Sequence, residues 1–200
     1  MLEGVLPTMN TSKTFPFVAK HLSLHFINTE VIRHDKRIEL LHDKQAVLDW
    51  LEALEKEGYI HKKQFETNWK NFTEADLAKL KSFRQFLRNT FEVFAAQQVP
   101  NNSWIQQLEK QIEMSPFTFK IKDNQLWRMS QGEIVEALMA HISFDALQLY
   151  TNGQLSHLHY CANPKCILLF LDTSGRRKWC SMKICGNRMK VTKHQNKQQK

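Results

Sequence analysis

Glycine is scarce in this sequence, with six residues in 200, and the motifs of glycine-rich catalytic loops are missing. There is no phosphate-binding loop, no H-E-x-x-H metal motif and no nucleophile elbow. No apolar run approaches the ~20 residues that a membrane-spanning helix requires. The start of the chain also lacks the basic and apolar regions of a signal peptide. The sequence therefore predicts a soluble, cytoplasmic protein that is not an enzyme and has no membrane partner.

Acidic residues are nearly absent from the last 40 positions. Residues 161–200 contain ten Lys/Arg and one acid, Asp172, which gives a charge of +9. The other 160 residues hold 18 bases and 19 acids and sum to −1, so the net charge of +8 lies in the last fifth of the chain. This asymmetry predicts a polyanion-binding tail on a neutral body, although a solvated terminus would give the same pattern.

The body has ordinary globular composition, with 42% hydrophobic and 24% charged residues, so a sizeable core is available. Alternating apolar and polar residues at 22–26 predict a half-buried strand. Residues 30–41 are ambiguous, and a second short strand is one interpretation. Asp43 is placed to cap a helix that ends at Gly58, and residues 61–71 indicate another helix.

The second half of the body predicts three helices and a hairpin. Residues 73–76 approximate a capping box ahead of a long helix that stops before Pro100. A shorter helix is expected from Asn102 or Ser103, with an apolar face of Ile105, Leu108 and Ile112. Residues 117–129 alternate around the turn at 123–124, which predicts a hairpin. Residues 130–133 fit a capping box for a helix that ends near 152–153.

Cysteine is absent from the first 160 residues, and all four cysteines follow the pattern C-x4-C-x13-C-x4-C: Cys161, Cys166, Cys180 and Cys185. Zinc takes four thiolate or imidazole ligands in a tetrahedron, and two close pairs supply them, so the spacing predicts a structural Zn²⁺ site. Disulfides are disfavoured in a cytosolic protein, while iron also suits four thiolates. Three histidines could replace a cysteine, although the four-thiolate set is already complete: His157, His159 and His194.

The residues around these cysteines resemble a known family. The strings C-A-N-P-K-C at 161–166, L-F-L-D-T-S at 169–174, W-C-S-M at 179–182 and C-G-N-R-M-K at 185–190 resemble the CGNR zinc finger, which is named after the motif at 185–188. In that family the finger follows a domain called ABATE, whose start resembles L-S-L-H-F-I-N-T at 22–29. The resemblance implies a bacterial stress-induced transcription regulator, with a finger that binds DNA and a body that acts as a sensor or interaction domain.

The pattern and the resemblance together predict three parts: a leader at 1–16, an ABATE-like helical domain at 17–153, and a CGNR zinc finger with a basic C-terminal tail at 154–200. The expected fold class is α+β, mainly α, with a small β element in the helical domain and a four-cysteine finger after it.

The basic tail supplies the candidate nucleic-acid contacts. A helix from Ser181 toward Gln195 would align Lys183 with Lys190 and Lys197 on one stripe, although Gly186 could instead mark a turn with the helix starting after it. The predicted contacts are Arg176, Arg177, Lys178, Lys183, Asn187, Arg188, Lys190, Lys193 and Lys197. Asn187 and Arg188 are the candidates for reading base edges, and they could equally brace the zinc turn. Trp179 is expected to pack over the metal site.

Three hypotheses follow from the sequence. The first is a zinc-containing DNA-binding regulator whose body senses a small-molecule effector or forms a homodimer. The second is an RNA- or protein-interaction module in which the finger is a structural element. The third is a redox switch in which oxidised thiolates release zinc, and it ranks lowest because structural zinc thiolates are less reactive than free ones.

Overall fold

The computed structural model describes residues 15–65, 71–122 and 124–191. About 52% of the structure is helical, and the strands of the described residues form small two-stranded antiparallel sheets. The expected α+β, mainly α fold is therefore confirmed. Most of the expected leader lies outside the described residues.

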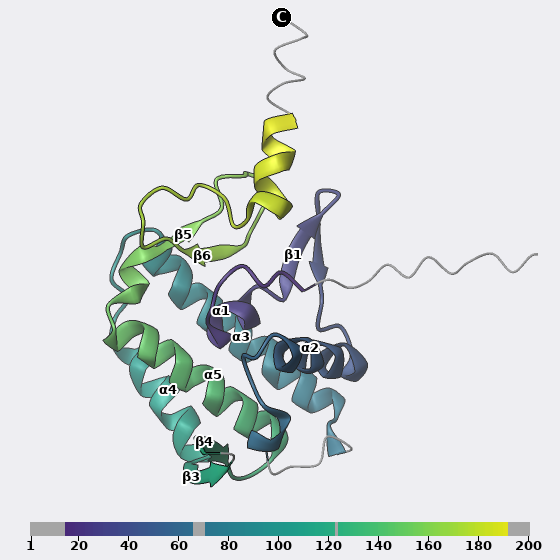
Figure 1. Ribbon diagram of the computed structural model, residues 1–200, viewed down its shortest axis with the longest axis vertical. Coiled ribbons are helices and arrows are strands. Elements are labelled where there is room, and N and C mark those ends of the chain that lie inside the picture. The colour runs from purple at the N-terminus through teal and green to yellow at the C-terminus, as the bar shows by residue number, and fades with distance from the viewer. Residues whose placement is uncertain (1–14, 66–70, 123, 192–200) are drawn as a thin grey trace, which may run out of the picture.

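Five helices and three strand pairs make up this part of the chain (Figure 1). The helices are α1 (Leu22–Ile27), α2 (Lys44–Lys56), α3 (Glu74–Ala95), α4 (Ser103–Met114) and α5 (Ile134–Thr151). The strand pairs are β1 (Glu30–Arg33) with β2 (Lys36–Glu39), β3 (Phe117–Lys122) with β4 (Gln125–Ser130), and β5 (Leu158–Tyr160) with β6 (Leu169–Leu171). The described residues also include short 3₁₀ helices, η1 (Lys62–Gln64) and η3 (Gln154–His157), and a π-helical turn, η4 (Met182–Gly186), followed by α-helical residues 187–191.

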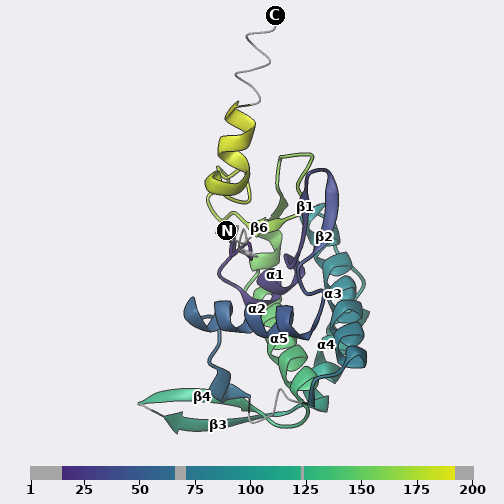
Figure 2. The same cartoon turned by 90° about the vertical axis from the view of Figure 1, so that its right-hand side faces the viewer.

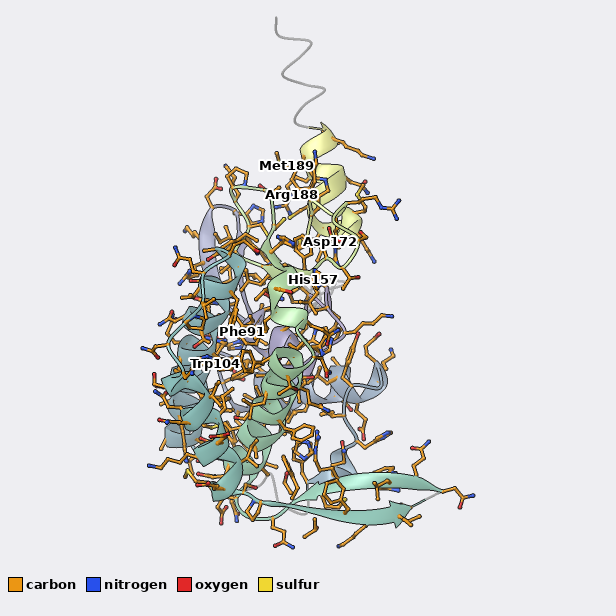
Figure 3. All side chains as sticks on the ribbon, turned by 90° about the vertical axis from the view of Figure 1, so that its left-hand side faces the viewer. Phe91, Trp104, His157, Asp172, Arg188 and Met189 are labelled. Atoms are coloured by element: carbon orange, nitrogen blue, oxygen red, sulfur yellow. The ribbon has the colours of Figure 1, made fainter. Side chains whose placement is uncertain are left out.

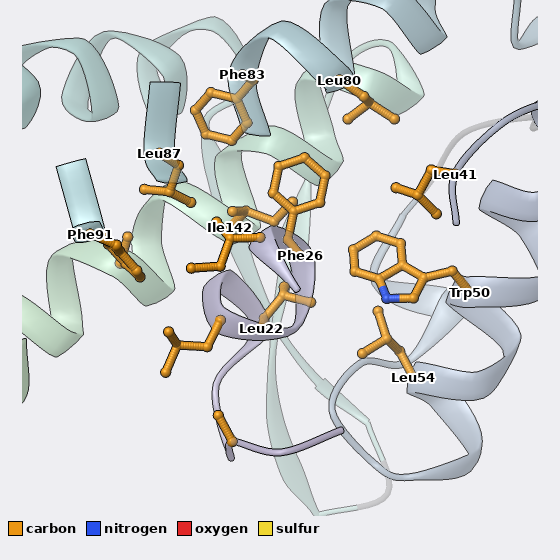
Figure 4. Packing of buried hydrophobic residues seen from close by; sticks show 14 of the residues in the cluster. Leu22, Phe26, Leu41, Trp50, Leu54, Leu80, Phe83, Leu87, Phe91 and Ile142 are labelled. Atoms are coloured by element: carbon orange, nitrogen blue, oxygen red, sulfur yellow. The ribbon is translucent and has the colours of Figure 1, made fainter. Parts of the chain in front are cut away.

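The core forms where α1 and α5 meet α2 and α3 (Figure 4). Phe26 of α1 is fully buried, and its ring centroid lies 5.7 Å from that of Trp50 and 5.9 Å from that of Phe83. Ile142 of α5 is also fully buried in this cluster. Burying one such side chain contributes roughly 1.5–3 kcal/mol. The short helix α1 is thus held in place by packing, because a helix of this length has little stability of its own.

Residues 22–26 form a helix, so the predicted strand is wrong. All six residues of α1 are buried, including the polar ones. His25 packs against the rings of Phe17 and Tyr59, and Ser23 donates to Asp145. The alternation of polar and apolar residues therefore does not correspond to alternating solvent-exposed and buried side chains here. The ambiguous segment that follows forms the β1–β2 hairpin, with positive φ at His34 and Asp35 (51° and 59°), as two-residue hairpin turns require.

Most of the predicted helix boundaries are confirmed. The Asp43 side chain accepts a hydrogen bond from the Ala46 N–H at the start of α2, and Gly58 adopts a φ of +77° just after its end. Thr73 and Asp76 form both hydrogen bonds of a capping box, and α3 ends at Ala95, before Pro100. The short helix α4 begins at Ser103 as expected, but its buried face is centred on Trp104, Leu108 and Gln111.

Two local predictions need correction. Ser130 belongs to β4, and α5 begins at Ile134 with Glu133 as an N-cap that makes no side-chain capping bond, so residues 130–133 are not a capping box. Gly132 takes a φ of +111°, which turns the chain between strand and helix. Within 61–71, the structure has the short helix η1 and a 3₁₀ conformation at Asn71, and residues 66–70 lie outside the described residues.

The predicted hairpin at 117–129 is confirmed as β3–β4, which projects from the body (Figure 2). Trp127 and Met129 are buried at its base. Phe119, Ile121 and Leu126 are exposed, with 61%, 78% and 69% of their surface accessible. The hairpin therefore offers an apolar face to solvent, which the sequence pattern alone did not reveal because both faces carry apolar residues.

Candidate metal centre and basic helix

The first cysteine pair lies on the turn between β5 and β6. The Cys161 N–H donates to the carbonyl of Leu168 (3.1 Å), which extends the ladder of the two strands. The Cys166 N–H donates to the carbonyl of Asn163 (2.9 Å), and the Asn163 side chain accepts from the Lys165 N–H (3.0 Å). This tight turn brings Cys161 and Cys166 to the same side.

The second pair is held by the start of a helix. Ser181 caps it by accepting the Ile184 N–H at 2.9 Å, and both the Cys185 and Gly186 N–H groups donate to the Ser181 carbonyl (3.0 Å each). The π turn η4 continues as an α-helix over 187–191. The helical segment therefore begins at Met182 with a π turn that contains Cys185 and Gly186, and its α-helical part starts after Gly186, at Asn187.

The four cysteine sulfur atoms converge on one point. All of them lie within 4.8 Å of one another, and the Sγ atoms of Cys166 and Cys180 are 3.9 Å apart. A tetrahedral zinc ion with Zn–S distances of ~2.3 Å requires S···S separations of about 3.8 Å. Cys161, Cys180 and Cys185 are buried and Cys166 is half-buried. Among the described residues this cluster contains no histidine. The donor set and its spacing thus fit a zinc ion with a closed coordination sphere.

The surroundings of the sulfur atoms favour negative charge. The Cys180 N–H donates to Cys161 Sγ, and the Asn163 side-chain amide donates to Cys185 Sγ, both at 3.4 Å. The N-terminus of the helix, which carries partial positive charge, adjoins the cluster. Hydrogen bonds from Cys166 and Cys180 lower the pKa of Cys161, while hydrogen bonding to Cys161 raises the pKa values of Cys166 and Cys180. Sulfur groups this close cannot all ionise without a cation among them.

Asp172 organises the loop between the two pairs. It accepts hydrogen bonds from the Ser174 N–H and hydroxyl and from the Arg177 N–H (2.9, 2.6 and 2.6 Å). The Ser174 hydroxyl and these N–H groups hold the pKa of Asp172 at about 2. Asp172, the single acid of the tail, is therefore buried in the finger. Its carboxylate binds groups of the loop and does not lie on the basic surface.

Arg177 is exposed, but its guanidinium is bound to the backbone of the finger. Its guanidinium donates to the carbonyls of Trp179 (2.9 Å), Val18 (3.0 Å) and Cys180, and it stacks 4.4 Å from the centroid of the Phe170 ring. The sequence predicted this side chain as a nucleic-acid contact. That stays a prediction, and in the structure the guanidinium also donates to backbone carbonyls next to the metal site.

The other predicted contacts that the structure describes are exposed as well. Arg176 and Lys178 are exposed on the loop, and the helix carries exposed Lys183, Asn187, Arg188 and Lys190. The π turn shifts the register between Lys183 and Lys190, because it contains more residues per turn than an α-helix. The straight stripe expected from a seven-residue spacing is therefore offset. Lys193 and Lys197, together with His194, lie outside the described residues.

The basic helix stands at one end of the molecule (Figures 1 and 2). Arg188 and Met189 lie at this end in Figure 3, whereas Trp104 lies within the helical body. Met189 is half-buried and Cys185 fully buried, so one side of the helix faces the metal site. Trp179 packs beside Gly186: a Cβ placed on that glycine would lie 3.2 Å from the Trp179 ring. This agrees with the expectation that Trp179 packs at the metal site.

The finger is joined to the body by polar contacts that the sequence analysis missed. Asn28, just after α1, both donates to the Leu169 carbonyl (2.9 Å) and accepts from the Leu169 N–H (3.1 Å). Arg88 of α3 donates to the carbonyls of Ile27 (2.6 Å) and Ile167 (3.0 Å). Both side chains are buried. Only Asn28 had a signal in the sequence, since it falls in the string that resembles the start of the ABATE domain.

These features define a mainly helical body that carries a four-cysteine, zinc-finger-like module. Residues 157–198 match the family model of the CGNR zinc finger. Residues 20–153 match the ABATE family, whose description is "Putative stress-induced transcription regulator". This match covers more than half of the chain, which therefore belongs to the ABATE family and has the arrangement that the sequence resemblance implied. A search of curated proteins gave no match.

Neither family description names an enzymatic activity. No helix in the described part of the chain combines the length and apolar character needed to cross a membrane.

Proposed function

We propose that this protein is a cytoplasmic, bacterial transcription regulator that binds DNA through its C-terminal zinc finger. The observation that carries the proposal is the placement of four convergent thiols at the base of a protruding helix on which the charged side chains at 182–191 are all basic. A rigid cationic helix of this kind can enter a groove or follow the phosphate backbone.

In this proposal one Zn²⁺ is held by Cys161, Cys166, Cys180 and Cys185. The ion supplies a structural cross-link and no catalysis, because four protein ligands leave no position for water or substrate. The two turns and the capped helix then keep a fixed orientation, which makes the helix surface suitable for recognition.

The roles proposed for the basic residues follow from their exposure. Lys183 and Lys190 contact phosphates from the helix, with Arg176 and Lys178 contributing from the loop. Asn187 and Arg188 are the candidates for contact with base edges. We leave Arg177 out of this set, since its guanidinium already donates to backbone carbonyls. Lys193 and Lys197 extend the contact as in the sequence prediction.

A salt titration with matched charge variants tests DNA binding. The double variant Lys183→Gln/Lys190→Gln should bind duplex DNA about 10-fold or more weakly, and its plot of log K against log salt should be shallower by about two phosphate contacts. Fluorescence anisotropy on the full chain measures both quantities. Lys56→Gln/Lys110→Gln, with two exposed lysines of the body, removes the same charge and should behave as the wild type. Equal losses in both double variants would mean general polyanion attraction and would contradict the proposal.

An RNA- or protein-interaction role for the finger is the second candidate. The same exposed cations attract any nucleic acid, because phosphate contacts carry no sequence information. Competition between duplex DNA, single-stranded RNA and heparin separates the candidates. Preference for single-stranded RNA over duplex DNA would replace the first proposal with the second.

The body is proposed to act as the sensor or as a dimer interface. The exposed apolar face of the β3–β4 hairpin, formed by Phe119, Ile121 and Leu126, supports contact with a second copy of the chain. Sedimentation should then detect a dimer that Ile121→Lys converts to a monomer. A wild-type protein that sediments as a monomer at all concentrations would exclude this homodimer.

A further inference from the structure

A small polar cavity lies in the helical body, away from the metal centre. It has a volume of about 110 Å³ and is formed by residues before and within α1, the segment at 59–64, β4 and α5. Its charged lining residues are Lys20, Arg128 and Asp145. Leu22, Tyr59 and Ile60 supply an apolar wall. The volume is below the ~300 Å³ at which pockets for drug-sized ligands begin, so the cavity suits a molecule of a few heavy atoms.

Arg128 is the unusual member of this lining. Its guanidinium lies 3.7 Å from the Phe144 ring centroid and 4.8 Å from that of Phe117, and its one hydrogen bond within the described residues is to Nδ1 of His141 (3.4 Å). No carboxylate of the described residues lies within ion-pair distance of the Arg128 guanidinium. Burial lowers the pKa of Arg128 to about 10, so the side chain remains charged at neutral pH. A partly buried cation without a carboxylate partner favours an anion beside it.

The neighbouring groups limit which anion fits. Asp145 uses its oxygens to accept from the Ser23 N–H (2.8 Å), the Ser23 hydroxyl (2.5 Å) and His21 (3.4 Å), so it does not neutralise Arg128 by direct contact. Burial lowers the pKa of His141 to about 3, and this ring is neutral. The lining carries two positive charges, on Lys20 and Arg128, and one negative charge, on Asp145, so its net charge is +1. One negative charge matches that balance, while a phosphate dianion would meet the repulsion of Asp145.

We propose that this cavity binds a short-chain monocarboxylate, with its carboxylate on the Arg128 guanidinium and its short chain against Leu22 and Ile60. A planar carboxylate can take two parallel hydrogen bonds from one guanidinium. The site would make this carboxylate the effector that the body senses. Only this sensing role rests on the proposed function, because binding of the carboxylate does not depend on it. Helix α1 links the two regions, because His21 and Ser23 before and within it hold Asp145, and Asn28 after it holds Leu169 of the finger.

Isothermal titration calorimetry on the full chain tests the site, in the absence of DNA and with chloride adjusted to constant ionic strength. The probes are acetate, pyruvate, inorganic phosphate and acetamide, the neutral analogue of acetate. Acetate or pyruvate should bind saturably with one site per chain. Phosphate should bind at least about 10-fold more weakly, and acetamide should not bind.

Two variants locate the binding. Arg128→Gln removes the cation and should weaken carboxylate binding by about 10-fold or more. Gln148→Trp, at an exposed lining residue, should block the cavity while every charge remains. Lys110→Gln on α4 is the control and should bind as the wild type. Thermal unfolding shows whether each variant is folded. If Arg128→Gln does not fold, the Gln148→Trp variant alone tests whether the carboxylate binds in this cavity.

Saturable binding that survives Gln148→Trp would overturn the proposal, as would equal binding of phosphate or no saturable binding of either carboxylate. None of these results would bear on DNA binding by the finger, which is measured separately without carboxylates.

Discussion

Cys180→Ser should lose the metal ion and, with it, the ordered finger. A serine hydroxyl does not ionise at neutral pH and is a poor zinc ligand, so a site of four thiolates becomes a site of three. Zinc binding supplies about 10–16 kcal/mol of folding free energy in small zinc modules. Zinc content should fall from one ion per chain to a small fraction of that. Affinity for duplex DNA should fall by about 100-fold or more, toward nonspecific binding.

Elemental analysis and anisotropy on the same preparations measure both effects. Thr173→Ala is the matched control, because Thr173 is an exposed residue of the loop between the cysteine pairs. It should keep its zinc and its affinity. A Cys180→Ser protein that retained one tightly held zinc ion and wild-type DNA affinity would show that the four-thiolate site is not what orders the finger.

Arg88→Met should cause the largest loss of stability in the body and loosen the finger at the same time. The Arg88 side chain is 2% exposed and donates to the carbonyls of Ile27 and Ile167, with Glu92 as an ion-pair partner (3.3 Å). Methionine leaves two carbonyls and a carboxylate without this donor, which costs about 3–5 kcal/mol. For a chain of this size that corresponds to a fall in Tm of about 10 °C.

The effect on the finger follows from the position of Ile167, directly after the ligand Cys166. Without Arg88 the Ile167 carbonyl loses its link to α3, so transfer of zinc to a chelator should become faster. Arg84→Met is the matched comparison. Arg84 lies one turn earlier on α3, is also buried, and binds Glu39 and Thr29 of the body instead. It should lower Tm without changing the rate of zinc transfer. Equal rates in both variants would mean that Arg88 does not hold the finger.

The parts of the structure that depend on local chemistry were predictable from the sequence. Asp43 and the pair Thr73–Asp76 fix helix starts through bonds within three residues, and the cysteine spacing brings four sulfur atoms together through two short turns. Each of these signals needs only neighbouring residues, so it can be read without knowing the fold.

The parts that failed depend on distant partners. The alternation at 22–26 indicated a strand because Ser23 and His25 were counted as solvent-facing, whereas Asp145, 122 residues beyond Ser23, accepts from Ser23 inside the protein. Arg177 is exposed, as expected of a cation in the tail, but no local pattern showed that its partners include the carbonyl of Val18, 159 residues away. The cavity at Arg128 combines four separate chain segments, and no local pattern marks it.

The central claim is that one zinc ion, bound by four thiolates, organises the basic helix. X-ray absorption at the zinc edge of the purified full chain tests it most directly. The account predicts one zinc per chain with four sulfur neighbours at ~2.3 Å and no nitrogen or oxygen ligand. A spectrum with nitrogen or oxygen ligands, or protein that is fully folded without stoichiometric metal, would contradict it.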